Sequence, residues 1–105
     1  MEAPNLNYIK KLSGGDSDFE DTLISVIKME FPIECEAFKE NISQNNYQEA
    51  AQNVHKLKHK ISILGLERSY FLADEFENDL KNEDPSRKGE FDEVLNHISA
   101  FLETI

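Results

Sequence analysis

The stretch that decides the fold runs from Tyr47 to Gly65 and reads YQEAAQNVHKLKHKISILG. Its apolar residues recur every three or four positions, the spacing that places them on one face of an α-helix. That face consists of Tyr47, Ala50, Ala51, Val54, Leu57, Ile61 and Leu64. The preceding turn ends on Asn46, a suitable N-cap, and Gly65 breaks the helix. The stretch therefore predicts one amphipathic helix that buries a single stripe.

The same period recurs on both sides of this stretch, and no segment alternates with period two for long enough to indicate a sheet. Pro32 predicts a bend near Phe31, and Asp84-Pro85 predicts the N-cap and first residue of the last helix. The other expected helices span about residues 6–12, 18–42, 67–82 and 85–105. Four long amphipathic helices with short loops bury their stripes by packing antiparallel. We predict an all-α fold, an antiparallel up-down-up-down four-helix bundle with a short extra N-terminal helix, in one domain spanning residues 1–105.

Composition narrows the classes of partner. The net charge of -10 argues against nucleic acid, which requires a basic surface to displace its counterions. Cys35 is the single cysteine and lies on the apolar spacing of its helix, so we expect a buried thiol, no disulfide and a cytoplasmic protein. No apolar run approaches the ~20 residues of a membrane span, and no signal-peptide pattern opens the chain. The expectation is a monomer that binds neither nucleic acid nor membrane.

One histidine stands out on the central helix. His55 lies roughly 140° from the centre of the apolar stripe, so it should face solvent. Lys58 and Ser62 follow three and seven residues later and should lie on the same side. An exposed imidazole is largely neutral at cytoplasmic pH and can attack phosphorus, while an ammonium beside it offsets phosphoryl charge and a hydroxyl adds a hydrogen bond. His55, Lys58 and Ser62 are therefore the predicted phosphoryl site.

These residues resemble a known family. Histidine followed by leucine two positions on, lysine three on and glycine ten on (His55, Leu57, Lys58, Gly65) is similar to the phosphorylation-site helix of histidine-containing phosphotransfer (HPt) domains. The likeness extends to the segment 12–16, LSGGD, and to Phe76-Glu77-Xaa-Xaa-Leu80, and so covers essentially the whole chain.

The resemblance implies a phosphorelay carrier of two-component signalling rather than an enzyme with its own kinase or ATP site. His55 would accept a phosphoryl group from a receiver-domain aspartate or a histidine kinase, hybrid kinases included, and pass it to another receiver aspartate. By the same likeness Lys58 assists the transfer. No intrinsic cofactor is implied, because the response-regulator receiver would bring the Mg²⁺.

One position departs from the family pattern. His59 stands where the family usually has glycine or another small residue, one turn from His55, and could crowd an incoming phosphoryl group. The alternative function is therefore a degenerate HPt-like bundle that binds proteins without phosphoryl exchange. For docking, we expect His59 together with an exposed apolar patch containing Ile63 and Leu66.

The histidine pair, the glycines and the acidic residues each admit another interpretation. His55 and His59 have the i, i+4 spacing of a metal-binding pair, but Lys56 stands where zinc proteases have glutamate, so no metal is expected. No glycine-rich phosphate loop is present, hence no nucleotide site. The acidic run that includes Asp74, Glu75, Glu77 and Asp79 is interpreted as a solvated face.

Overall fold

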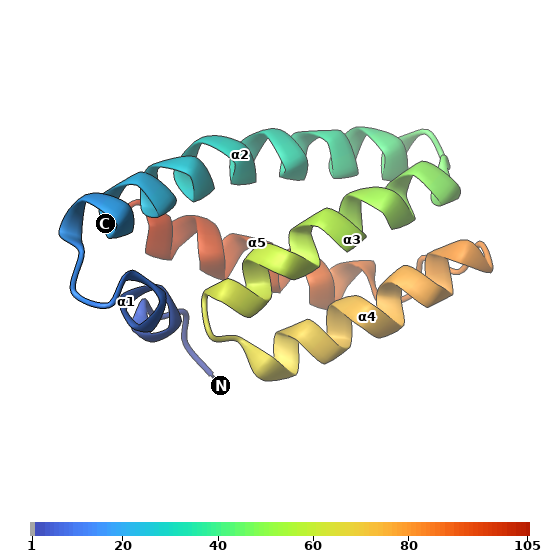
Figure 1. Ribbon diagram of the computed structural model, residues 1–105. Coiled ribbons are helices and arrows are strands. Elements are labelled where there is room, and N and C mark those ends of the chain that lie inside the picture. Colours follow the sequence, from blue (N-terminus) through green and yellow to red (C-terminus); the bar gives the residue numbers. More distant parts are fainter. Residues whose placement is uncertain (1) are drawn as a thin grey trace.

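The computed structural model describes residues 2–105, which form helices and no strands. The helices are α1 (Asn7–Ser13), α2 (Ser17–Ser43), α3 (Tyr47–Ile63), α4 (Glu67–Lys81) and α5 (Lys88–Leu102). The all-α prediction is confirmed, and most helix ends fall within two residues of those expected. Figure 1 shows α2 to α5 running in alternating directions, with α1 packed near the end where α2 begins.

The helices enclose one elongated core. α3 makes its main contacts with α4 and α2, while α5 packs on both α4 and α2. Phe38, Phe76 and Phe91 meet in the interior with ring centroids 5.2–6.0 Å apart, each fully buried. Burying each ring contributes about 1.5–3 kcal/mol. The 27 residues of α2 extend about 40 Å at 1.5 Å per residue, which accounts for the 43 Å length of the molecule.

Two helix starts illustrate what local sequence can and cannot determine. The Asp16 carboxylate accepts hydrogen bonds from the backbone N–H groups of Asp18 and Phe19, at 3.1 and 3.2 Å, and so caps α2. The predicted start of the last helix at Asp84-Pro85 is wrong. The Asp84 carboxylate instead accepts a bond from the backbone N–H of Ser86, closing a turn, and α5 begins only at Lys88.

The interior of α2 and the start of α3 each contain a residue that the sequence marked as special. α2 continues through Pro32 as one helix, and the Pro32 side chain is exposed. The bend expected near Phe31 stays a prediction. Asn46 occupies the N-cap position of α3, but its side chain makes no capping hydrogen bond. The position was predicted correctly and its capping bond was not.

The N-terminal segment fixes the turn between α3 and α4. The backbone N–H of Asn5 donates to the carbonyl of Leu64 at 2.9 Å. Gly65 has φ +80°, and a Cβ added there would lie 2.7 Å from the Asn5 amide nitrogen. Glycine suits this left-handed position, because any side chain there would be strained and would displace the Asn5 amide. The turn thereby sets how α4 lies against α3, where the candidate site is built.

Candidate functional site

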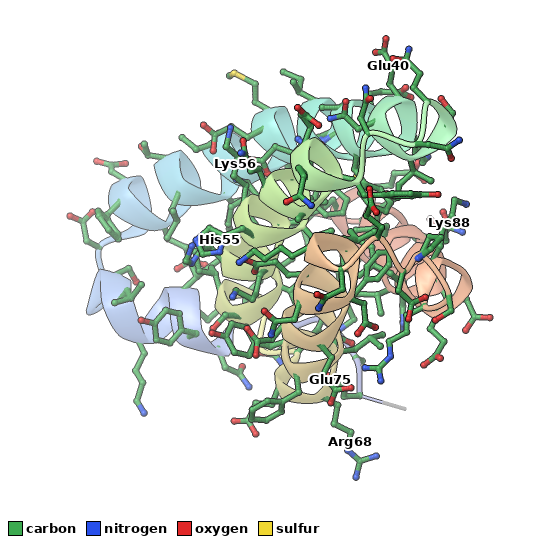
Figure 2. All side chains as sticks on the ribbon, turned by 90° about the vertical axis from the view of Figure 1, so that its right-hand side faces the viewer. Glu40, His55, Lys56, Arg68, Glu75 and Lys88 are labelled. Atoms are coloured by element: carbon green, nitrogen blue, oxygen red, sulfur yellow. The ribbon has the colours of Figure 1, made fainter. Side chains whose placement is uncertain are left out.

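His55 projects from the middle of α3 into solvent. Its side chain is 52% exposed, as its position on the helical wheel predicted. Figure 2 shows it on the side of α3 that faces away from α5. The neighbouring turns of α3 bury Val54, Leu57 and Ile61 completely, so the helix backbone that carries the imidazole is held firmly.

The imidazole is oriented by a carboxylate from α4. Nδ1 of His55 lies 3.2 Å from both carboxylate oxygens of Glu77. Because an ionised carboxylate only accepts hydrogen bonds, we assign the proton of the neutral ring to Nδ1, which donates it to Glu77. Nε2 then carries the lone pair. The geometry supplies a nucleophilic nitrogen on an exposed ring whose other nitrogen is anchored.

Glu77 is a buried anion surrounded by cations. Its side chain is 9% exposed and lies 3.0 Å from Nζ of Lys58 and 3.2 Å from Nζ of Lys81. Burial by itself raises the pKa of Glu77, but the hydrogen bonds it accepts from Lys58 and His55 outweigh burial and lower that pKa. Glu77 is therefore ionised at neutral pH.

The expectation that Glu77 belongs to a solvated acidic face is wrong. Glu77 directly follows the core residue Phe76 and precedes the core residue Leu80 by three positions, so it lies at the edge of the buried stripe of α4. α3 covers that edge with Lys58 and His55. The sequence did single out this position, because Glu77 is part of the Phe76-Glu77-Xaa-Xaa-Leu80 segment that resembles HPt domains. That resemblance did not indicate what Glu77 does.

Lys58 is placed differently from a free phosphoryl-binding ammonium. It is only 7% exposed, and its Nζ donates to the carboxylates of Asp74 and Glu77, both at 3.0 Å. Burial lowers the pKa of Lys58, and the two carboxylates more than compensate and raise it. The Tyr70 ring centroid lies 5.6 Å from the same Nζ. Lys58 thus balances the charge that orients His55, and its direct action on a phosphoryl group stays a prediction.

The remaining predicted residues divide between surface and core. His59 is exposed, and its ring meets that of His55 edge to face with centroids 5.0 Å apart. Ser62 is exposed and Ile63 half-buried. Leu66 is only 2% exposed, so its assignment to an exposed docking patch is wrong. It precedes α4 directly and packs into the core with the buried residues of that helix.

Sequence reasoning also missed the larger exposed apolar side chains. They are at least 40% exposed and lie mostly on α1 and α2: Tyr8, Leu12, Phe19, Val26, Met29, Ile33 and Phe71. Val26, Met29 and Ile33 recur at helical spacing and so share one face of α2. Glu30, on the same stretch, pairs with Lys60 of α3 at 3.1 Å, so this face borders α3.

Within residues 2–105, no three histidine, cysteine or carboxylate side chains gather into a cluster fit for a metal ion. None of the helices in that range combines the length and hydropathy needed to cross a bilayer. Comparison of the chain with protein-family models, with curated proteins and with solved structures gave no match. The residues of the site therefore carry the functional argument.

Proposed function

We propose that this protein is a phosphoryl carrier in which a histidine on a helical scaffold holds the group between transfers. More specifically, it acts as an HPt domain of a two-component phosphorelay, with α2 to α5 as an antiparallel up-down-up-down four-helix bundle and α1 as the extra N-terminal helix. The observation that carries the proposal is the exposed imidazole of His55 held through Nδ1 by the buried carboxylate of Glu77. We place its work in the cytoplasm, where phosphorelay partners operate.

The transfer step follows from the assigned tautomer. The Nε2 lone pair of His55 attacks the phosphorus of an aspartyl phosphate on a receiver domain, the N–P bond forms and the P–O bond to the aspartate breaks. The aspartate leaves as a carboxylate, and the receiver's Mg²⁺ neutralises the transferring oxygens. The proton on Nδ1 stays in place throughout. The reverse sequence passes the group to a second receiver.

Glu77 supports this step as a positioning residue. Forming the N–P bond leaves positive charge on the imidazole ring, and the carboxylate 3.2 Å from Nδ1 stabilises that charge. Lys58 and Lys81 keep Glu77 ionised and fixed, which holds the ring in one tautomer. Hydrogen bonds to charged groups contribute about 1.5–3 kcal/mol, which corresponds to roughly 10- to 100-fold in rate.

The surface around His55 suits a protein partner. His59 and Ile63 lie on the outward side of α3, and the exposed face of α2 formed by Val26, Met29 and Ile33 borders α3. Exposed apolar side chains of this kind favour docking of a protein such as a receiver domain over capture of a small phosphorylated molecule. We place the receiver contact on this α2–α3 surface, which includes Ile63 but not the buried Leu66.

The test is transfer from a phosphorylated receiver domain. Wild-type protein should acquire acid-labile, base-stable label, and His55→Gln should acquire none. His97→Gln is the matched control, because His97 is exposed on α5 and plays no part in the site. Label that persists in His55→Gln would refute the assignment of the acceptor.

The alternative function, a bundle that binds receivers without phosphoryl exchange, rests on His59. Its ring lies against that of His55, in the space near an incoming phosphoryl group. If His59 crowds the acceptor, His59→Gly should accept label faster than wild type, and an unchanged rate would exclude crowding. Tight receiver binding with no label in either protein would establish the alternative.

A further inference from the structure

Two side chains of the site form a pair that phosphoryl transfer does not use. His55 and His59 are both exposed on α3, one turn apart, and their ring centroids are separated by 5.0 Å with planes at 89°. Imidazole nitrogen is a ligand for borderline transition metals. Whether these two rings can share one ion depends on their spacing, on the orientation of each ring and on the surrounding charge.

The spacing fits a tetrahedral ion. With Zn–N distances of about 2.0–2.1 Å, the centre of each imidazole lies about 3.2 Å from the metal, and two rings at a tetrahedral angle have centres about 5.2 Å apart. The observed 5.0 Å agrees with that value. The i, i+4 separation on one helix face is also the spacing at which paired histidines bind zinc.

The ring of His55 is already oriented as a ligand. Metal-binding histidines commonly donate their second ring N–H to a carboxylate, which fixes the tautomer and raises the basicity of the ligating nitrogen. Glu77 accepts from Nδ1 of His55 in this way, leaving Nε2 to coordinate. The expectation of no metal relied on Lys56 following His55. Lys56 is one residue on and therefore about 100° around the helix, and in Figure 2 it lies nearer α2 than His55 does.

The local charge permits a dication. The nearest buried ammonium, Lys58, is paired with the carboxylates of Asp74 and Glu77. The chain as a whole carries a net charge of -10. Hard cations such as Mg²⁺ prefer oxygen ligands and gain nothing from two imidazoles.

We infer that His55 and His59 together form a binding site for one Zn²⁺-like transition-metal ion, with water completing its coordination. The site takes the same Nε2 lone pair that attacks phosphorus. Bound metal therefore blocks phosphorylation of His55, a consequence that rests on the proposed function, whereas metal binding itself does not.

Calorimetric and NMR titration of the whole chain with ZnCl₂ tests the site. One ion per chain should bind, with shifts of the imidazole C–H signals of His55 and His59 but not of His97. His55→Gln and His59→Ala should each weaken binding more than tenfold, Glu77→Gln about tenfold, and His97→Ala should leave it unchanged. MgCl₂ should shift none of the three rings. Helical circular dichroism of each variant confirms that it is folded.

Two results would overturn the inference: a His59→Ala variant that binds Zn²⁺ as tightly as wild type, or ring signals that do not move at millimolar Zn²⁺. A second arm measures label transfer from a phosphorylated receiver with the chain pre-loaded with Zn²⁺, using a receiver activated beforehand and desalted. Loss of label in wild type and its retention in His59→Ala supports the blocking role. If the chain acquires no label even without Zn²⁺, the proposed function is refuted. The metal site is then judged from the Zn²⁺ titrations alone.

Discussion

Replacing Glu77 by glutamine tests the centre of the site, because it removes one negative charge and little volume. The carboxylate is 9% exposed and receives bonds from Lys58 at 3.0 Å and from His55 and Lys81 at 3.2 Å. The glutamine carbonyl can still accept one of them, so one or two charged hydrogen bonds are lost. At about 1.5–3 kcal/mol for each, part of which Asp74 recovers for Lys58, we expect a loss of about 2–3 kcal/mol in unfolding free energy.

The destabilisation caused by Glu77→Gln should depend on pH, in a direction set by the lowered pKa of Glu77. The pKa of Glu77 is lowered in the folded protein, so its stabilisation is fully present above the ordinary value of 4.5 and is lost as pH falls through the folded value. The deficit of Glu77→Gln relative to wild type should therefore be complete at pH 7 and shrink as pH falls below 4.5.

Urea unfolding followed by circular dichroism measures this deficit at pH 7 and at pH 3, and thermal unfolding gives the melting temperature. At pH 7 the melting temperature should fall by roughly 10–20 °C, at about 4–8 °C per kcal/mol for a domain of this size. Glu36→Gln is the control, since Glu36 is exposed on α2 and its replacement should change stability by no more than about 0.5 kcal/mol. An equal deficit at pH 7 and pH 3, or no deficit, would refute the buried-anion argument.

Three further predictions concern stability and reactivity. Lys58→Met should lower the free energy of unfolding, measured with urea at pH 7, by about 2 kcal/mol, because the buried Glu77 carboxylate loses the Lys58 ammonium. An unchanged free energy would mean that the Lys58–Glu77 pair does not stabilise the fold. Gly65→Ala should lower the free energy of unfolding by about 2 kcal/mol, because of the φ of +80° and the clash with Asn5. Gly89→Ala, which has open space at its Cβ, should raise that free energy by about 0.5 kcal/mol, and equal effects of the two changes would contradict the turn geometry. Burial raises the pKa of Cys35 to about 12, so a thiol reagent at pH 8 should label it only after unfolding, and rapid labelling of native protein would contradict its burial.

Helical period in the sequence was enough to place the helices, because α2 to α5 each bury several residues at helical spacing. Residues such as Val54, Leu57 and Ile61 are fully buried where the period placed them. The start of α5 was misjudged, since Asp84-Pro85 fits a tight turn as well as it fits a helix N-terminus. In the folded chain the Asp84 carboxylate accepts from the backbone N–H of Ser86, and α5 begins at Lys88.

One part of the candidate site could be predicted from a single helix, and the other part could not. The exposure of His55 depends on α3 alone, so a helical wheel could assign it. The burial of Glu77 and Lys58 depends on how α4 lies against α3, and neither sequence segment contains that angle. A wheel drawn for one helix treats every charged residue outside the stripe as solvated, and it fails where a second helix covers the edge of that stripe.

The Lys58–Glu77 ion pair at that covered edge can matter for the stability of the fold, for the orientation of His55, or for both. Desolvating Lys58 and Glu77 costs free energy that cancels much of what their hydrogen bonds and mutual attraction contribute, and buried ion pairs replaced by apolar residues of similar size often leave a protein as stable or more stable. The double variant Lys58→Met/Glu77→Met should therefore match or exceed the wild type in urea unfolding. Yet it leaves Nδ1 of His55 without its carboxylate, so phosphoryl acceptance should fall roughly 10- to 100-fold. A stable double variant with undiminished transfer would show that the ion pair neither stabilises the fold nor orients the histidine.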